Sequence, residues 1–354
     1  MDILILGGTG AMGVPLIGIL SQDNNNIYVT SRSHRENKRN VEYLCGNAKT
    51  DEFFLSLMER DYDVIFDFLV YTTEELERRL NVILEHTKQY FFFSSSRCYA
   101  DSMKPITEDA DRLVDVCYNP VYLALDEYGM AKGREENLLR ATNKKNWTII
   151  RPYITYNDYR LQLGVYEKEN WLKRALEGRT IVFPKDIAER RTSLTYGPDV
   201  AAALAKLIGN EKALGEAFHI TTTENHTWGE ILDFYCSVIE KKTGNRPKVL
   251  LVEDSEELQN YWNPWQIKYD RLYNRIFDNS KIEDAIGNFV FKSTFDGLEE
   301  SLSNFIDNPK WLNIDWRFEA WCDYKSKEFT PLGEIEGIKT KINYIKCRAT
   351  RWLK

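Results

Sequence analysis

The sequence predicts an α/β protein whose core is a doubly wound parallel β-sheet. Three observations lead to this prediction. Short apolar segments that suit buried strands alternate with segments of helical spacing between residue 1 and about residue 150. A glycine-rich turn follows the first apolar segment. The chain of 354 residues is also long enough to bury the core of one large α/β domain or of two modest ones.

The first half of the chain supplies the sheet. Met1 to Leu6 is a short apolar run that stops at glycines, and it therefore suits a buried parallel strand. The following strands are expected at 27–30, 41–45, 63–70, 90–94 and 147–151. Apolar residues at helical spacing predict the intervening helices at 11–20, 51–60, 74–86 and 123–142.

The second half is less regular. Helices are expected at 170–176, 199–208, 228–242 and 295–306, with a strand at 248–252. From about residue 307 the composition changes, because four tryptophans gather there among scattered basic residues: Trp311, Trp316, Trp321 and Trp352. A packed C-terminal appendage or a subunit contact is favoured over an aromatic platform for nucleic acid.

Composition excludes several classes of protein. A net charge of −7 argues against a broad basic surface for nucleic acid or for an anionic membrane. The six cysteines form no CxxC pair and show no zinc-ligand spacing with the four histidines, so free thiols and no metal site are expected. The apolar N-terminus carries Asp2 in place of a basic region and is interrupted by glycines, so it reads as neither a signal peptide nor a membrane span. We therefore expect a cytoplasmic protein.

The glycine-rich turn has the spacing of a phosphate cradle. In GGTGAMG, glycines three residues apart would permit a tight turn, a close approach of backbone to a pyrophosphate, and close packing of the next helix. Because the turn lies between the first strand and the first helix, an anion would sit at the N–H groups of that helix. The predicted cofactor-binding residues of this Rossmann-type loop are Gly7, Thr9, Gly10, Ala11, Met12 and Gly13.

The end of the second strand indicates which dinucleotide is bound. An acidic residue there would accept the ribose hydroxyls of NAD, but the segment VTSRSHR contains no carboxylate. Ser31 and Arg32 could instead bind the 2′-phosphate of NADP, with Arg35 as a further cation. NADP(H) is therefore the predicted cofactor, and NAD(H) the alternative. The expected regions are a dinucleotide-binding domain at 1–155, a smaller mixed α/β substrate-binding region at 156–305 interleaved with a later strand and helix of the first, and an appendage at 306–354.

A tyrosine and a lysine form a candidate acid–base pair. Tyr128 and Lys132 lie four residues apart within a predicted helix, so they project from one face. A free tyrosine ionises only near pH 10, and a neighbouring ammonium favours the phenolate.

In combination these motifs resemble the short-chain dehydrogenase/reductase superfamily, and in particular its extended branch of nucleotide-sugar epimerases, dehydratases and reductases. The branch's serine segment is similar to SSSRCYAD, and its acidic turn is similar to PITEDA. Its later segments are similar to IIRPYITY, RRTSLTYGPDV and FDNSKIEDAIG. The resemblance covers about residues 1 to 305 and excludes the appendage.

The resemblance implies roles for particular residues. The active hydroxyl lies four residues before the segment's Tyr99, which selects Ser95, with Ser96 as the fallback and a possible substrate contact. The dehydratases' Asp and Glu are replaced by Ser96 and Arg97, so plain redox chemistry is expected. The remaining residues that the resemblance implies are Asn47 at the adenine, Tyr153 near the nicotinamide, and Arg190 or Arg191 at the substrate's diphosphate.

The leading hypothesis is an NADP(H)-dependent oxidoreductase that acts on a nucleotide-linked sugar, with Ser95, Tyr128 and Lys132 as catalytic residues. Lys132 is also expected to hold the nicotinamide ribose of the cofactor. The nearest alternative is a nucleotide-sugar epimerase that retains NAD(P). A third hypothesis, a dinucleotide sensor or RNA-binding protein of this fold that has lost catalysis, is disfavoured by the complete catalytic set and the negative charge. The resemblance also implies a homodimer.

Overall fold

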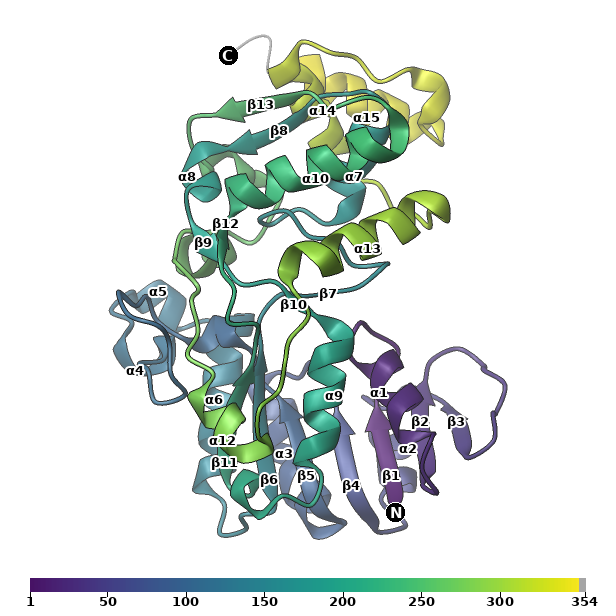
Figure 1. Cartoon of the computed structure of the whole chain (residues 1–354), viewed down its shortest axis with the longest axis vertical. Helices are drawn as coiled ribbons and strands as arrows, with labels where there is room; N and C mark the ends of the chain where they lie inside the picture. The colour runs from purple at the N-terminus through teal and green to yellow at the C-terminus, as the bar shows by residue number, and fades with distance from the viewer. Residues whose placement is uncertain (350–354) are drawn as a thin grey trace. The chain divides into compact units, whose positions relative to one another are not determined.

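The structure is a computed structural model that describes residues 1–349 (Figure 1), so Trp352 lies outside the described residues. The described chain forms two compact units. Unit 1 comprises residues 1–155, 193–224 and 275–294. Unit 2 comprises residues 156–192, 225–274 and the chain from 295 onward.

Unit 1 is built on a parallel sheet of seven strands in the order β11-β6-β5-β4-β1-β2-β3. This confirms the predicted doubly wound sheet. The chain leaves β1 toward β2 and β3 and then returns to build β4, β5, β6 and β11 on the other side, so the order reverses between β1 and β4. Ligands of such sheets bind beyond the carboxyl ends of the strands at this reversal. The strands are β1 (Asp2–Leu6), β2 (Asn26–Ser31), β3 (Val41–Cys45), β4 (Tyr62–Asp67), β5 (Thr87–Phe93), β6 (Trp147–Pro152) and β11 (Glu216–Ile220).

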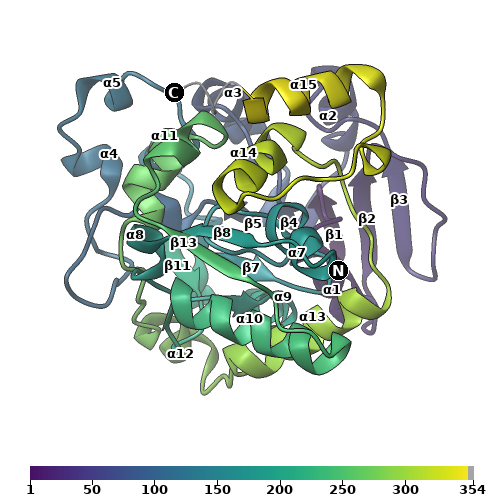
Figure 2. The same ribbon diagram turned by 90° about the horizontal axis from the view of Figure 1, so that it is seen from above.

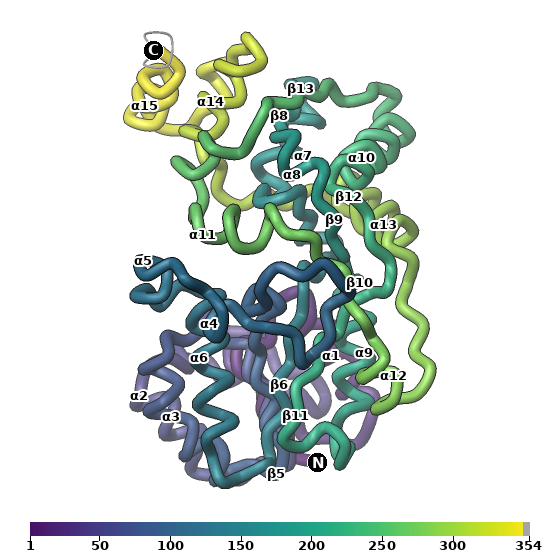
Figure 3. The backbone as a smooth tube through the Cα atoms, turned by 90° about the vertical axis from the view of Figure 1, so that its left-hand side faces the viewer, coloured from purple at the N-terminus to yellow at the C-terminus, as the bar shows by residue number. Residues whose placement is uncertain are grey.

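Helices cover both faces of this sheet, and the alternation of strand side chains explains why. In β1, Ile3 and Ile5 pack on one face, whereas Leu4 and Leu6 pack on the other. The first face is covered by α1 (Gly13–Leu20), α9 (Gly197–Leu207) and α12 (Ser280–Ile286), and the second by α2 (Asp51–Leu57), α3 (Thr73–Glu85) and α6 (Tyr128–Ala141). Figure 3 shows α12 beside α9, although the two helices are far apart in the sequence.

The predicted helix at 123–142 is wrong at its start. The structure has a short helix α5 (Pro120–Leu123), preceded by α4 (Leu113–Val116), and a separate helix α6 that begins at Tyr128. Glu127 has extended backbone angles, and its carboxylate accepts a hydrogen bond from Gly129 N at 2.9 Å. A helix cannot continue through such a capping residue, so Tyr128 is the first residue of α6.

Unit 2 contains two small pairs of strands and several helices. The strands β8 (Ile181–Pro184) and β13 (Val249–Val252) are parallel, and β9 (Arg191–Thr192) and β12 (His226–Thr227) are antiparallel. Figure 2 shows β8 beside β13, with α10 on one side of them and α14 on the other. The helices are α7 (Lys168–Leu176), α8 (Lys185–Ala188), α10 (Trp228–Thr243), α11 (Pro264–Gln266), α14 (Trp316–Ser326), α15 (Ile338–Ala349) and α13 (Thr294–Asp307), whose first residue belongs to unit 1. Of the two remaining short strands, β10 (Thr195–Tyr196) belongs to unit 1, whereas β7 (Thr155–Tyr156) has one residue in each unit.

Buried charge fixes the C-terminal helices to unit 2. The Arg174 guanidinium in α7 is fully buried and lies 2.7 Å from the Glu319 carboxylate and 2.9 Å from the Asp323 carboxylate, both in α14. The Asp323 carboxylate also accepts a hydrogen bond from the Tyr344 hydroxyl in α15 at 2.5 Å. The described part of the C-terminal segment is therefore packed against the rest of unit 2.

Candidate functional site

The glycine loop after β1 has the geometry that a phosphate cradle requires. Gly7 has a φ of 72°, in the left-handed region that favours glycine. A Cβ on Gly13 would lie 2.5 Å from the Gly8 carbonyl oxygen, so this position requires glycine for packing. A Cβ on Gly10 would meet no atom within 4 Å and would instead project into open space beside the loop.

The backbone amides of this loop are available to an anion. Within the described residues, no backbone hydrogen bond engages the N–H groups of Gly10, Ala11 and Met12, which directly precede α1. The Thr9 amide donates to the Gly7 carbonyl at 2.9 Å and so tightens the turn. Donors at the start of a helix, beside a glycine without a side chain, fit the pyrophosphate of a dinucleotide.

The end of β2 presents a cation rather than a carboxylate. The buried Ser31 hydroxyl donates to the Ser33 carbonyl at 2.8 Å, so it is already engaged within the loop. Arg32 is exposed, and among residues 1–349 it forms no ion pair. Arg35 is exposed, with its guanidinium carbon 5.9 Å from the Tyr43 ring. Arg32 is thus a cation that is accessible to an anion.

Asn47 lies after β3, in the turn that leads into α2. Its side-chain oxygen accepts a hydrogen bond from Lys49 N at 3.2 Å, and its carbonyl accepts one from Thr50 N at 2.9 Å. The side chain is exposed, and its amide group is still able to reach a ligand.

The three serines after β5 differ in how they are bonded. Ser94 Oγ donates to the Glu136 carboxylate at 2.6 Å, and Ser96 Oγ donates to the Arg151 carbonyl at 2.9 Å. Ser95 Oγ accepts a hydrogen bond from Arg97 N at 3.2 Å and donates none within the described residues. Its two neighbours hold the segment, whereas the Ser95 proton is left for a ligand.

A buried ion pair lies beneath the serine segment. The Arg151 guanidinium in β6 donates to both Glu136 carboxylate oxygens at 2.7 and 2.6 Å and to the Tyr99 hydroxyl at 2.8 Å. Burial raises the pKa of Glu136, but the Arg151 charge and its hydrogen bonds outweigh burial and lower this pKa to about 2. Burial raises the pKa of the neighbouring Cys98 thiol to about 12, so this thiol is unreactive at neutral pH.

Tyr128 and Lys132 lie in the first turns of α6. Tyr128 is half-buried, and the Arg97 guanidinium carbon lies 5.1 Å from the centre of its ring. Arg97 pairs with the Glu127 carboxylate at 2.7 Å. The Lys132 ammonium is buried, 5.8 Å from the centre of the Tyr128 ring and 4.7 Å from that of Phe92. The ammonium is thus close enough to act electrostatically on the phenol.

Sequence reasoning missed two carboxylates near Lys132. Glu135 is fully buried, and its Oε2 lies 2.9 Å from Lys132 Nζ. Asp67, at the end of β4, is also fully buried, and its charge acts on Lys132. The spacing of three residues between Lys132 and Glu135 was the available signal, because it places both on one face of a helix.

Tyr153 follows β6 and is buried, with its ring centre 5.4 Å from that of Phe277. The next residue, Ile154, has a φ of 29°, which β-branched residues rarely adopt. Such strained backbone persists only where the surrounding structure determines it.

The two arginines predicted for the substrate lie in unit 2 and differ in their bonding. The Arg191 guanidinium donates to the side-chain oxygen of Asn225 at 2.8 Å and to its carbonyl at 3.1 Å. Arg190 Nε is buried, and within the described residues it has no hydrogen-bond partner. Arg190 is therefore the better candidate for an anionic ligand.

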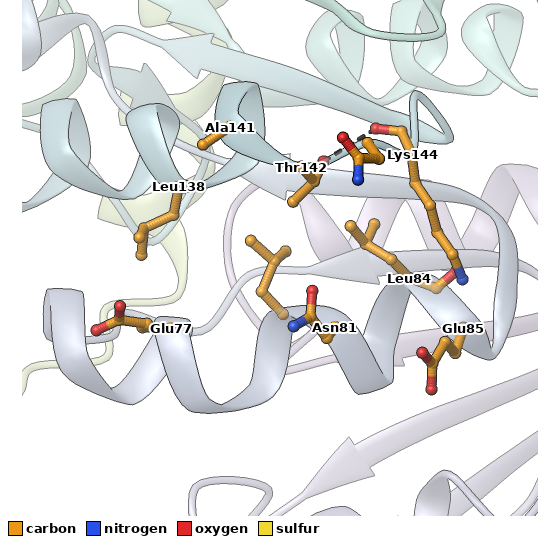
Figure 4. A pocket seen from close by; sticks show the side chains of 10 residues that line it. Glu77, Asn81, Leu84, Glu85, Leu138, Ala141, Thr142 and Lys144 are labelled. Carbon is orange, nitrogen blue, oxygen red and sulfur yellow. Dashed lines mark hydrogen bonds between the residues drawn. The ribbon is translucent and has the colours of Figure 1, made fainter.

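A separate pocket of about 510 Å³ lies between α3 and the end of α6 (Figure 4). Glu77, Asn81 and Glu85 line it from α3, with Leu138 and Lys144 on the other side. Helix α3 ends here just before β5 begins, and α6 ends just before β6 begins. The pocket therefore lies at the amino ends of these strands, away from the glycine loop and the serine segment.

The sequence of this chain is similar to those of two known proteins, each over part of its length. No family model matches the sequence. The chain is 27% identical over 239 residues to the chloroplast stem-loop binding protein of 41 kDa b from Arabidopsis thaliana, a match that covers 62% of this chain and 58% of the relative. It is 23% identical over 244 residues to 2′-dehydrokanamycin reductase from Streptomyces kanamyceticus, covering 66% of this chain and 65% of the relative. Each match thus spans less than two thirds of the relative's length.

Solved structures show the fold. A short-chain dehydrogenase/reductase superfamily protein from Agrobacterium tumefaciens, with bound NAD, superimposes with a TM-score of 0.65 at 16% identity, over 87% of this chain and 98% of that one. The chain has the extended short-chain dehydrogenase/reductase fold. UDP-glucuronic acid 4-epimerase from Bacillus cereus, in complex with UDP-glucuronic acid and NAD, matches with a TM-score of 0.64 at 17% identity, over 87% and 99% of the two chains. In this dehydrogenase/reductase fold the glycine loop, the serine segment and α6 of the present chain all follow carboxyl ends of sheet strands, where ligands bind.

Proposed function

We propose that the protein is an NADP(H)-dependent oxidoreductase that reduces or oxidises a carbonyl or hydroxyl carbon of a nucleotide-linked sugar. The observation that carries this proposal is the Ser95 hydroxyl, with no acceptor within residues 1–349, together with the Tyr128–Lys132 pair on α6. A complete donor and acid–base set is what carbonyl reduction requires.

Each residue of the site has a separate role in the proposed reaction. The amides of Gly10, Ala11 and Met12 bind the pyrophosphate. When bound, the nicotinamide supplies the hydride that the carbonyl carbon accepts. Ser95 donates a hydrogen bond to the carbonyl oxygen and stabilises the negative charge that develops there. Tyr128 gives its proton to that oxygen, so the alkoxide leaves as a hydroxyl, and Lys132 stabilises the phenolate that remains.

A preference for NADP(H) over NAD(H) is part of the proposal. It is supported by the exposed Arg32 after β2 and by the lack of a carboxylate in this loop. A guanidinium binds phosphate oxygens in pairs, whereas the ribose of NAD is favoured by an acid. NAD(H) remains the alternative, since the solved structures of this fold named above contain NAD.

The nearest alternative reaction is epimerisation with a retained cofactor, which the Bacillus cereus protein's description favours. Arg190 is the proposed contact for the substrate's diphosphate in either case, because its buried Nε lacks a protein partner among the described residues. Net change of absorbance at 340 nm during turnover distinguishes the two reactions, since an epimerase regenerates its cofactor.

A second candidate function is the RNA binding considered from the sequence, and it is favoured by the name of the Arabidopsis relative, a stem-loop binding protein. The net charge of −7 opposes it, because RNA affinity depends on cations that release counterions. Binding of an RNA stem-loop that weakens steeply with salt and does not change in Tyr128→Phe would favour it.

The experiment that tests the leading proposal uses UDP-glucose and UDP-glucuronic acid as first probes, each with NADP(H) and NAD(H), followed at 340 nm. Tyr128→Phe should lower turnover by about 10²- to 10⁴-fold. Tyr118→Phe is the matched control, because Tyr118 is 94% exposed. Equal turnover in wild type and Tyr128→Phe would refute the assigned acid.

Two expectations remain to be tested with the purified protein. The homodimer stays a prediction that light scattering would settle. A reducing compartment such as the cytoplasm is proposed because all six cysteines are unpaired. Among the helices of residues 1–349, none combines the length and apolar character needed to cross a bilayer.

A further inference from the structure

The buried surroundings of Lys132 include a carboxylate, that of Glu135, which the proposed reaction does not itself require. The ammonium is 1% exposed, and Glu135 Oε2 lies 2.9 Å from it with the Glu135 side chain fully buried. The Phe92 ring, 4.7 Å away, forms part of the same surroundings. Both charges of the pair are therefore removed from water.

A buried ammonium needs a counter-ion to stay charged. Burial disfavours the charged form of an amine, and isolated buried lysines lose their proton near neutral pH. A carboxylate within ion-pair distance favours the charged form instead. Within the described residues, Glu135 is the carboxylate in ion-pair contact with Lys132.

We propose that Glu135 is a positioning residue that keeps Lys132 protonated and directed toward Tyr128. This inference rests on the proposed function, since it assigns the reason why Lys132 can act on the phenol. Glu135 itself need not touch substrate or cofactor.

Other charged and titratable groups face this pair from each packed element. Asp67 comes from β4, Tyr90 from β5, and Asp126 from the segment before α6. The Asp67 carboxylate accepts hydrogen bonds from the Tyr71 and Tyr90 hydroxyls at 3.0 and 2.9 Å. Burial raises the pKa of Glu135, and Lys132 opposes this rise. Asp67 acts on Lys132 from beyond ion-pair distance, so Glu135 is the group whose removal matters most.

The first test is Glu135→Gln, which keeps the size of the side chain and removes its charge. The Nζ resonance of Lys132 in ¹⁵N-lysine-labelled protein, assigned with Lys132→Arg, reports whether the amine is charged in the absence of any substrate. The ammonium signal should persist to a higher pH in wild type than in Glu135→Gln. An ammonium that persists equally in both proteins would overturn the proposal.

The matched control is Glu169→Gln. Lys168 and Glu169 form another buried pair, 2.7 Å apart with each side chain 5% exposed, in unit 2. Glu169→Gln also removes one charge of a buried ion pair, so it should destabilise the fold to a similar extent. Because that pair lies in unit 2, the variant should leave the Lys132 resonance unchanged. A change seen only in Glu135→Gln would therefore not be explained by a general loss of stability. A changed Lys132 resonance in Glu169→Gln would count against the assignment.

Function is tested separately through the pH profile. In Glu135→Gln, oxidation of a substrate hydroxyl, for which the Tyr128 phenolate is the base, should require a higher pH than in wild type, because an uncharged amine no longer favours the phenolate. NADPH affinity should fall by about 10-fold, because an uncharged amine binds a ribose hydroxyl less strongly. Glu135→Asp restores the charge and should return the profile toward wild type. Should Glu135→Gln fail to fold, a Glu135→Asp variant that keeps the Lys132 ammonium signal as wild type does would support the proposal, and one that loses this signal at a lower pH than wild type would refute it. A changed Lys132 resonance without any turnover in wild type would sustain the inference about Lys132 while refuting the proposed function.

Discussion

Glu136 and Asp67 are both carboxylates with no exposed surface in unit 1, but their pKa values move in opposite directions. Glu136 faces the Arg151 and Arg112 guanidinium groups at 2.6 and 3.1 Å, and its pKa falls to about 2 despite burial. Asp67 is bonded by neutral groups, the Leu69 amide and two tyrosine hydroxyls, and burial raises its pKa to about 6. Between these two fully buried carboxylates, the charge of the hydrogen-bonding partners decides the sign of the pKa shift.

The two carboxylates therefore suit different tasks. Glu136 is a fixed anion that ties Ser94 and Arg151 together beneath the serine segment. Asp67 can change its charge in a range near neutral pH, close to Lys132. Variants at Glu136 and at Asp67 should therefore differ in how their stability depends on pH.

The largest effect on stability is expected when the ion pair between Arg151 and Glu136 is broken. Arg151→Met leaves Glu136 with one guanidinium instead of two, and breaking a buried pair costs about 3–5 kcal/mol of the free energy of unfolding. Urea denaturation at pH 7 measures this. Asp115→Asn, at the exposed end of the Arg112 contact, is the control and should cost less than about 1 kcal/mol. A cost below that level for Arg151→Met would contradict the account.

The pH dependence of Glu136 follows from its lowered pKa. The folded value of about 2 lies below the ordinary value of 4.5, so its contribution is present above about pH 4.5 and is lost as the pH falls toward 2. The size is roughly 3 kcal/mol at 1.36 kcal/mol per pKa unit. Stability curves of wild type and Glu136→Gln should therefore converge in acid, and parallel curves would show that the arginines do not hold this charge.

Asp67 should behave in the opposite way, with a slightly smaller effect. Its folded pKa of about 6 exceeds the ordinary 3.8, so its favourable contribution is present below about pH 3.8 and is lost as the pH rises through 6. Relative to Asp67→Asn, wild type should lose roughly 3 kcal/mol of unfolding free energy between pH 4 and pH 7. Unfolding experiments across this range that show no relative change would mean that Asp67 is not desolvated.

The smallest effect concerns an exposed charge. If Arg32 binds the 2′-phosphate, the contact contributes about 1.5–3 kcal/mol, and Arg32→Ala should weaken NADPH roughly 10- to 150-fold with NADH nearly unchanged. Fluorescence titration of both nucleotides measures this, with the exposed Arg78→Ala as control. Equal losses for the two nucleotides, or tighter binding of NADH by wild type, would reverse the assignment to NADP.

Structural features that depend on residues close together in the sequence could be predicted from sequence patterns. The parallel sheet and the glycine loop are of this kind, because alternation and spacing express them locally. The Tyr128–Lys132 spacing also places both residues on one helix, although the start of that helix depends on the Glu127 cap.

Tertiary pairing could not be predicted in this way. Glu135 and Glu136 are adjacent and both buried, yet one meets Lys132 and the other meets Arg151. Likewise, the bond between Ser96 and the Arg151 carbonyl, 55 residues apart, separates the roles of Ser95 and Ser96. Local spacing does not contain this information.

The most direct test of the central claim, that unit 1 binds a dinucleotide at the glycine loop, compares Gly10→Ala with Gly18→Ala. A Cβ at either position meets no protein atom within 4 Å, so neither change should disturb the fold. Gly10 lies in the loop, whereas Gly18 lies on the exposed side of α1. Calorimetric titration with NADPH and NADH should show binding to wild type and Gly18→Ala, and at least about 10-fold weaker binding to Gly10→Ala, because the added methyl group occupies the space of the pyrophosphate. Equal binding by the two variants, or no binding of either nucleotide to wild type, would contradict the account.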